Sequence, residues 1–378
     1  MRIRPEGLAQ DRPDLPVIAR EVTLVCALAC ATLLAPVGSA GQTGGPNGTI
    51  YFGTYAKTIL VVDERTMTVR DTIPVSVGIP ATFFPSADRR KLYIMDPAAE
   101  NVEVIDLATR RQLDRFTLSD ANRRVRIWGL NVDPLERFAV LLVKTYAKKV
   151  DRFEVGPPTL LRYDLRQHAV TDTIAWPEGE QREGARILFS PDGQYLYFFA
   201  EDILIYDAAT LKQVDRWQLA TALEEGMGRF NFGLPEDIYE EPGFYTGLFR
   251  VTDPVQNRQL MGVARVNLAA KSVEFYTLGP NQPVSFRLGP DRRKAYGLRS
   301  QTGNYEFWTF DLENRRVTGR TSFAGRPRMN TSVSTDGRFL YIHTAGSTID
   351  LYDTETFRLV RTVDLGADMT RFVLLPGR

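Results

Sequence analysis

One pattern recurs along the chain from Gly48 onward, and it constrains the fold more than any other feature. Each copy has an apolar stretch that ends near Pro, a polar turn, an aromatic-rich run, a run that ends in Asp, and a final alternating run. In one copy, residues 186–193 (RILFSPDG) lead into residues 195–200, and residues 203–207 and 213–219 follow. Each run has the length and the β-branched or aromatic content of a strand. The pattern therefore predicts a repeated four-stranded unit.

The copies can be counted by the residue that ends each first strand. These markers are Pro85, Pro134, Pro191, Pro235, Pro290, Thr335 and Pro376. The last marker has no further strands behind it, whereas residues 49–73 supply three strands with no first strand ahead. Pairing of the chain ends would remove an exposed sheet edge, which could otherwise template aggregation. We therefore expect an all-β, seven-bladed β-propeller over residues 48–378, closed by N- and C-terminal strands in one blade.

The N-terminal region predicts export. Residues 22–37 (VTLVCALACATLLAPV) form the only long apolar run, after Arg20 and before small residues at 38–40. This is typical of a signal peptide over residues 1–40, followed by a linker over 41–47, with the true start near Val17. An uncleaved anchor is the alternative. We expect a periplasmic or secreted location and no membrane contact beyond this segment.

The composition offers few residues for chemistry. Cys26 and Cys30 both lie in the signal segment, so the mature chain has no thiolate for a disulfide, a metal or a linked cofactor. The only histidines, His168 and His343, fall in different blades and at different strand positions, which gives no evident triad or metal geometry. Lys and Arg number 47 against 46 Asp and Glu, which argues against nucleic-acid binding. We expect no catalytic residue and no metal ligand in this chain.

Most recurring polar and aromatic residues have a structural explanation. Aspartates end the third strands, where they can cap tight turns: Asp106, Asp164, Asp207, Asp311 and Asp353. Aromatic residues of the second strands are expected to pack between blades: Tyr93, Tyr195, Tyr197, Phe198, Phe244, Tyr245 and Tyr341. Phe244 and Tyr245, beside an elaborated loop, are also candidate partner contacts.

Arginines occur at or just before the first strands of five blades, which line the central channel of a propeller. They are Arg126, Arg186, Arg229, Arg328 and Arg371. We interpret them as a positive collar at the channel mouth that meets an anionic ligand or acidic groups of a partner, because guanidinium groups pair with carboxylates in a fork geometry. The alternative is five solvated or aspartate-paired side chains.

Two loops are longer than the repeat requires, at residues 145–158 (TYAKKVDRFEVGPP) and 252–259 (TDPVQNRQ). Both fall between a second and a third strand, which places them on the face that also carries the connections between blades. Loops on a rigid scaffold are common binding sites.

The chain resembles the β subunit of periplasmic quinohaemoprotein amine dehydrogenases, among the YVTN-type propellers. The similarity is carried by residues 59–63 (ILVVD), 152–159 (RFEVGPPT), 310–313 (FDLE), 332–337 (SVSTDG) and 351–356 (LYDTET). It runs through most of the mature chain. The Phe-Glu-Val loop and the run 333–337 are its more specific elements.

The resemblance implies a role without catalytic residues in the oxidative deamination of primary amines. In that family, a small γ subunit carries cysteine tryptophylquinone and a dihaem cytochrome c α subunit takes the electrons, while the β propeller holds the small subunit and walls the substrate cavity. It implies that this chain binds neither cofactor. The partner-binding residues would be Arg152, Phe153, Glu154, Val155 and Pro157, with Phe244 and Tyr245 nearby.

Two other interpretations stay open. One is a stand-alone secreted propeller that binds a ligand or a protein partner. The other is a lactonase-like propeller with a metal in its channel, for which Asn131 and Asn231 are the main candidate ligands.

Overall fold

The computed structural model describes residues 45–184, 186–200, 202–219, 231–233 and 237–377. The predicted signal peptide with both cysteines, residues 41–44 of the predicted linker, Arg229 and the Pro235 marker lie outside these residues. Within them the protein is all-β, with one short 3₁₀ turn at Pro177–Gly179. No helix among the described residues has the length and apolar character needed to cross a membrane.

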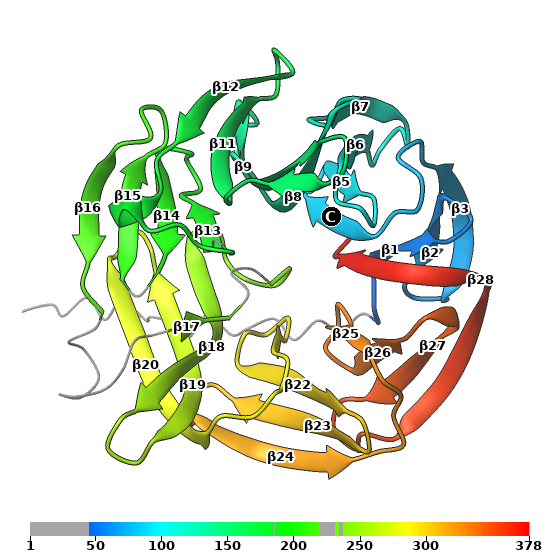
Figure 1. Ribbon diagram of the computed structural model, residues 1–378. Coiled ribbons are helices and arrows are strands. Elements are labelled where there is room, and N and C mark those ends of the chain that lie inside the picture. Colours follow the sequence, from blue (N-terminus) through cyan, green and yellow to red (C-terminus); the bar gives the residue numbers. More distant parts are fainter. Residues whose placement is uncertain (1–44, 185, 201, 220–230, 234–236, 378) are drawn as a thin grey trace, which may run out of the picture. The chain divides into compact units, whose positions relative to one another are not determined.

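The described strands form six antiparallel sheets, all within the compact unit Gly44–Arg378, and Figure 1 shows them in chain order. Four sheets have four strands. They are β4 (Thr82–Pro85), β5 (Lys91–Met95), β6 (Asn101–Asp106) and β7 (Gln112–Thr117); β13 (Arg186–Phe189), β14 (Tyr195–Phe199), β15 (Ile203–Asp207) and β16 (Gln213–Trp217); β17 (Asn231–Phe232), β18 (Phe244–Asp253), β19 (Arg258–Asn267) and β20 (Ser272–Pro280); and β21 (Arg287–Leu288), β22 (Lys294–Gln301), β23 (Asn304–Asp311) and β24 (Arg316–Ser322).

The other two sheets depart from four strands. One contains β8 (Arg123–Val132), β9 (Phe138–Lys148), β11 (Thr159–Asp164) and β12 (Ala169–Ile174), with the short β10 (Phe153–Val155) added beside β9. The other has seven strands in the order β25 (Asn330–Val333), β26 (Phe339–His343), β27 (Gly346–Asp353), β28 (Leu359–Leu375), β1 (Thr49–Thr54), β2 (Thr58–Asp63) and β3 (Thr68–Pro74).

Strand β28 has different neighbours along its length. Its first part pairs with β27, with Leu359 opposite Tyr352 and Asp364 opposite Thr348. Its second part pairs with β1, with Leu375 opposite Thr49. The two ends of the described chain therefore share one sheet.

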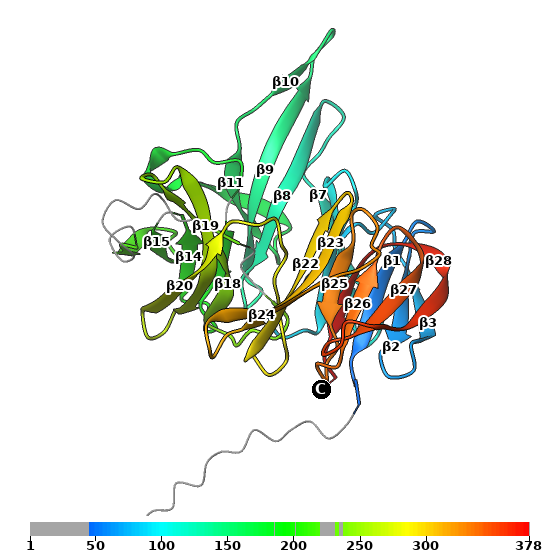
Figure 2. The same cartoon turned by 90° about the horizontal axis from the view of Figure 1, so that it is seen from below.

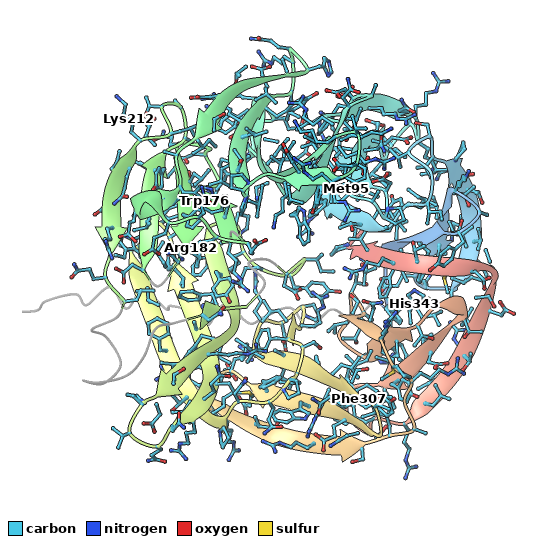
Figure 3. The ribbon with its side chains drawn as sticks, in the orientation of Figure 1. Met95, Trp176, Arg182, Lys212, Phe307 and His343 are labelled. Carbon is cyan, nitrogen blue, oxygen red and sulfur yellow. The ribbon has the colours of Figure 1, made fainter. Side chains whose placement is uncertain are left out.

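The core is divided among apolar clusters that lie between neighbouring groups of strands. One cluster joins β14 and β15 to β18 and β19, and another joins β5 and β6 to β8 and β9. Strands such as β2 (TILVVD) and β6 (NVEVID) are buried at four successive positions, because both of their faces pack against neighbours. In another cluster the Phe307 ring stacks on Phe323 at 4.0 Å and on Phe357 at 5.2 Å (Figure 3). Of the second-strand aromatic residues predicted to pack between blades, five are buried in these clusters: Tyr93, Tyr197, Phe198, Tyr245 and Tyr341. The prediction is wrong for Tyr195, which is 39% exposed.

The third-strand aspartates cap turns, as the sequence predicts. In the turn after β15, Asp207 Oδ1 accepts hydrogen bonds from the Thr210 amide and hydroxyl, both at 2.7 Å. Asp353 accepts the same pair of bonds from Thr356 after β27. These hydrogen bonds hold the pKa of both carboxyls below its usual value. The carboxylates are therefore occupied by their own turns.

The connection from β17 to β18 crosses to other sheets. In its described part, residues 237–243 (DIYEEPG), the Asp237 carboxylate accepts a hydrogen bond from the Leu288 amide at 3.1 Å. The Tyr239 hydroxyl donates to the Val333 carbonyl at 2.6 Å, and the Ile238 carbonyl accepts from the Arg89 guanidinium. This connection, called the crossing segment below, therefore contacts three sheets besides its own.

Candidate functional site

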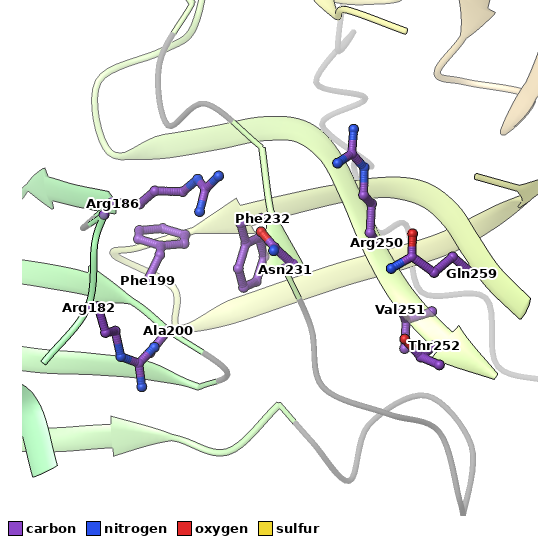
Figure 4. Close-up of a pocket in the computed structure, with 11 residues that line it drawn as sticks. Arg182, Arg186, Phe199, Ala200, Asn231, Phe232, Arg250, Val251, Thr252 and Gln259 are labelled. Atoms are coloured by element: carbon purple, nitrogen blue, oxygen red, sulfur yellow. The ribbon is translucent and has the colours of Figure 1, made fainter. Parts of the chain in front are cut away.

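A solvent-accessible cavity of about 370 Å³ lies between the sheet that begins with β13 and the sheet that begins with β17 (Figure 4). Its polar lining consists of Arg182, Arg186, Asn231, Arg250, Thr252 and Gln259. Its volume falls within the range of small-molecule pockets. A concave surface with convergent polar side chains is the general form of a ligand site.

Strand register explains how these side chains meet. Asn231 on β17 lies directly opposite Arg250 on β18, so both side chains leave the same face of the sheet. Thr252 on β18 lies opposite Gln259 on β19 in the same way. Arg186 is the first residue of β13, and Figure 4 shows its side chain extending toward β17. The sheet with the long β18 and β19 thus supplies one wall, and β13 the other.

Aromatic packing makes the base of the cavity rigid. Phe199 of β14 and Phe232 of β17 pack edge to face, with ring centroids 5.3 Å apart. Tyr245 lies 5.3 Å from the Phe199 ring and 5.7 Å from the Phe232 ring. All three rings belong to the cluster that joins the two sheets. The polar side chains of the cavity therefore lie above a layer of closely packed aromatic rings.

The charge in the cavity is positive. Arg182 pairs with Glu180 at 3.2 Å, but its Nε atom is buried and has no hydrogen-bond partner among the described residues. Arg186 and Arg250 form no side-chain hydrogen bond or ion pair with any residue that the structure describes. Burial lowers the pKa of the Arg186 guanidinium; the nearby Tyr245 side chain opposes this shift, and the positive charge of Arg250 adds to it. No described carboxylate lines the cavity to compensate these charges.

A second candidate is the hairpin of β9 and β10, which projects beyond the neighbouring strands (Figure 2). Phe153 and Val155 are 56% and 57% exposed, and Val150 at the turn is fully exposed. Beside them, Glu154 forms ion pairs with Lys149 at 3.2 Å and with Arg152 at 3.1 Å. Exposed apolar side chains framed by charges are typical of a protein-binding surface.

The other residues predicted to contact a partner lie in different environments. Pro157 is exposed at the base of the hairpin. Phe244 is half-buried beneath the Arg265 guanidinium, which lies 5.1 Å from its ring centroid. Tyr245 is completely buried. Of the predicted set, Arg152, Phe153, Glu154, Val155 and Pro157 lie together, while Tyr245 supports the cavity from below.

The arginines predicted as a collar also differ in environment. Arg126 on β8 lies 5.3 Å from the Tyr146 ring, and Arg328 and Arg371 are exposed. Arg186 lies in the cavity with Arg182 and Arg250. Sequence reasoning missed these two neighbours. Arg182 precedes the strand, outside the repeat pattern, and Arg250 is a second-strand residue whose register with Asn231 becomes visible only once the strands pair.

The histidines and the candidate metal ligands lie apart. His168 is an exposed turn residue whose Nδ1 lies 3.0 Å from the Asp114 carboxylate. His343 is buried, with Nε2 3.1 Å from the Thr370 carbonyl, and burial lowers its pKa. Asn131 lies on β8 and Asn231 in the cavity. Within the described ranges, no group of three or more His, Cys, Asp or Glu residues could hold a metal ion.

No protein-family model matches the sequence, and no curated protein sequence matches it. Similar solved structures include apo AztD from Citrobacter koseri, with 13% identity and a TM-score of 0.53 over 88% of this chain and 99% of that chain. A functionally unknown protein from Desulfotomaculum acetoxidans matches 88% of this chain and 100% of its own, with 13% identity and a TM-score of 0.54. The match to the β-propeller domain of Swd1 from Myceliophteria thermophila covers 82% of this chain and 92% of that domain's chain, with 12% identity and a TM-score of 0.49.

AztD, which matches with a TM-score above 0.5, is a β-propeller protein, and this all-β chain has a β-propeller fold. At identities this low, the likeness shows the fold alone.

Proposed function

We propose that the chain is the non-catalytic β-propeller subunit of a periplasmic quinohaemoprotein amine dehydrogenase. In this role it holds a small quinone-bearing subunit, contacts a dihaem cytochrome c subunit, and helps to wall the cavity in which a primary amine is oxidised. The quinone and the haems belong to the partner chains. The observation that carries the proposal is the projecting hairpin, which presents Phe153 and Val155 to solvent within one of the two more specific parts of the resemblance to this family.

We also propose that the propeller has seven blades and closes through its chain ends. The seven-stranded sheet divides into two blades at β28, because the first part of this strand pairs with β27 and the second with β1. With the five other sheets, this makes seven. Seven apolar clusters support the same count, and one of them joins the sheet that contains β1 and β2 to the sheet that contains β5 and β6. Closure buries both outer edges of the strand array.

Export to the periplasm is part of the proposal, since c-type cytochromes and quinone-bearing subunits of this family assemble there. The signal-like residues 1–40 support it. N-terminal sequencing of the chain purified from the periplasm would test it, and an N-terminus close to residue 41 is the expected result.

The docking role can be tested by recovering the tagged chain from its native periplasm, followed by haem staining and mass spectrometry. We expect a c-type cytochrome and a small crosslinked chain to accompany it. Replacing Phe153 and Val155 together with Ser should abolish this recovery, because hydrophobic contacts at the centre of an interface carry much of its free energy. The control replaces Val214 and Val360 with Ser; each is 54% exposed and lies outside the hairpin.

A stand-alone secreted propeller that binds a ligand is the second candidate, and the arginine-lined cavity favours it. Recovery of a colourless, monomeric chain, unchanged by the hairpin substitutions, would support this candidate and reject the dehydrogenase role.

A further inference from the structure

We propose that the arginine-lined cavity binds a small organic anion through a carboxylate or phosphate group. This site lies apart from the β9–β10 hairpin and is separate from the docking role. It can therefore exist whether or not the chain joins a dehydrogenase complex.

The positive charge of the cavity is only partly balanced by carboxylates among the described residues. Arg182, Arg186 and Arg250 bring three guanidinium groups to one concave surface, and only Arg182 has a carboxylate partner among the described residues. Arginine stays protonated at neutral pH even when burial lowers its pKa. Arg186 is partly buried, whereas Arg250 is exposed. Removing the Arg186 charge from water costs free energy unless an opposite charge compensates it. A bound anion would supply that compensation.

The cavity also contains guanidinium hydrogen-bond donors that no described residue occupies. Arg186 and Arg250 have guanidinium forks that no described residue occupies, and the buried Nε of Arg182 lacks a partner. A guanidinium fork matches the two oxygens of a carboxylate or phosphate. Asn231, Thr252 and Gln259 add neutral hydrogen-bonding groups on the same lining. These can orient the uncharged part of a ligand.

The shape of the cavity points to a small molecule. A volume of about 370 Å³ is near the lower end of the range for ligand pockets. The packed rings of Phe199, Phe232 and Tyr245 hold β14, β17 and β18 against one another, so the backbone positions of Asn231 and Arg250 are set before the ligand arrives. Such preorganisation reduces the entropy lost on binding.

Calorimetric titration of the purified chain at low salt tests the site. The probes are succinate, citrate and inorganic phosphate, with succinamide as the uncharged counterpart of succinate. We expect at least one anion to bind with 1:1 stoichiometry, weaker affinity in added NaCl, and no binding of succinamide. Binding of the carboxylates but not phosphate would assign a carboxylate ligand, and the reverse would assign a phosphate ligand.

Matched variants assign the binding to this cavity. Arg186→Gln and Arg250→Gln should each weaken binding by about tenfold or more, because each removes charge-assisted hydrogen bonds. Arg361→Gln removes the same charge from an exposed position on β28 and should leave affinity within about twofold of the original. Wild-type affinity in Arg186→Gln, or an equal loss in Arg361→Gln, would overturn the proposal. So would the absence of binding of all three anions up to about 10 mM.

Thermal unfolding without ligand separates binding from folding. If Arg186 serves a ligand, Arg186→Gln should unfold at the same or a higher temperature than the original chain, because an uncompensated charge is removed. A clearly lower unfolding temperature would give Arg186 a structural role and contradict the proposal.

Discussion

The β9–β10 hairpin and the crossing segment, residues 237–243, are both additions to a four-stranded repeat, but the side chains of the hairpin are exposed while those of the crossing segment contact other sheets. In the hairpin, all residues from Lys149 to Val155 are exposed, and the ion pairs of Glu154 stay within it. In the crossing segment, Asp237 and Tyr239 bond to β21 and β25. The hairpin leaves its apolar side chains exposed, where a partner can contact them. The crossing segment packs its apolar side chains between sheets.

The difference shows that an insertion is functional or structural according to where its apolar residues can be buried. Tyr239 packs against two separate apolar clusters, and Ile238 packs against a third. Phe153 has no cluster within reach of its position beyond the sheet. Since buried apolar area stabilises a fold and exposed apolar area favours association, the two additions serve different purposes.

The largest effect should come from Tyr239→Ala. We expect the free energy of unfolding to fall by about 3 kcal/mol, because the change removes aromatic packing against two clusters and the hydrogen bond to the Val333 carbonyl. Urea denaturation followed by tryptophan fluorescence measures this. Tyr195→Ala, at a residue 39% exposed on β14, is the control and should cost less than about 1 kcal/mol. Equal losses in the two variants would contradict the structural role of the crossing segment.

An effect of intermediate size concerns the dependence of the free energy of unfolding on pH. Burial raises the pKa of the Asp237 carboxyl above its usual value of 3.8, and the charge of Arg287 only partly offsets this. Between the unfolded-state pKa near 3.8 and the higher folded-state pKa, the folded chain binds more protons than the unfolded chain. This group therefore makes the free energy of unfolding fall as pH rises. Asp237→Asn removes the effect. We expect the variant, compared with the original chain between about pH 4 and 7, to gain stability as pH rises above about 4, by up to about 1.4 kcal/mol per unit.

Parallel stability curves for the two proteins across that pH range would show that Asp237 does not titrate with folding. Glu154→Gln in the hairpin is the matched control, because its carboxylate is exposed and pairs only with exposed partners.

The smallest effect on stability should come from shortening the hairpin. Replacing residues 148–153 with Asn-Gly, a sequence suited to a two-residue turn, should change the free energy of unfolding by less than about 0.5 kcal/mol, since the removed side chains are exposed. The same change should abolish recovery of the proposed partner subunits. A large loss of stability would instead make the hairpin part of the scaffold.

The repeat allowed much of the local structure to be predicted. The turn-capping role of Asp207 and Asp353, the position of residues 145–158 between a second and a third strand, and the all-β character agree with the structure. Residues 252–259 are not a long loop, because β18 and β19 extend into this stretch and pair up to Asp253 and Arg258. These features depend on residues close in sequence, so their spacing is sufficient to infer them.

The cavity was only partly predictable. The sequence predicts Arg186 as a channel residue because it begins a first strand, whereas Arg250 joins it only through the pairing of β17 with β18. For Tyr245 the sequence predicts packing between blades and, from the neighbouring loop, a partner contact; the residue lies in the core beneath the cavity. Which face a side chain takes depends on register, and a shift of one residue reverses it.

The sequence by itself determined the β-propeller repeat and most strand and turn positions within each copy. Only the tertiary structure decided that residues 237–243 join three other sheets, that the 145–158 loop projects into solvent, and that three arginines share one cavity. The physical reason is distance along the chain. Strands and turns form between neighbours in sequence, while burial and charge in a cavity depend on contacts between strands that are far apart in it.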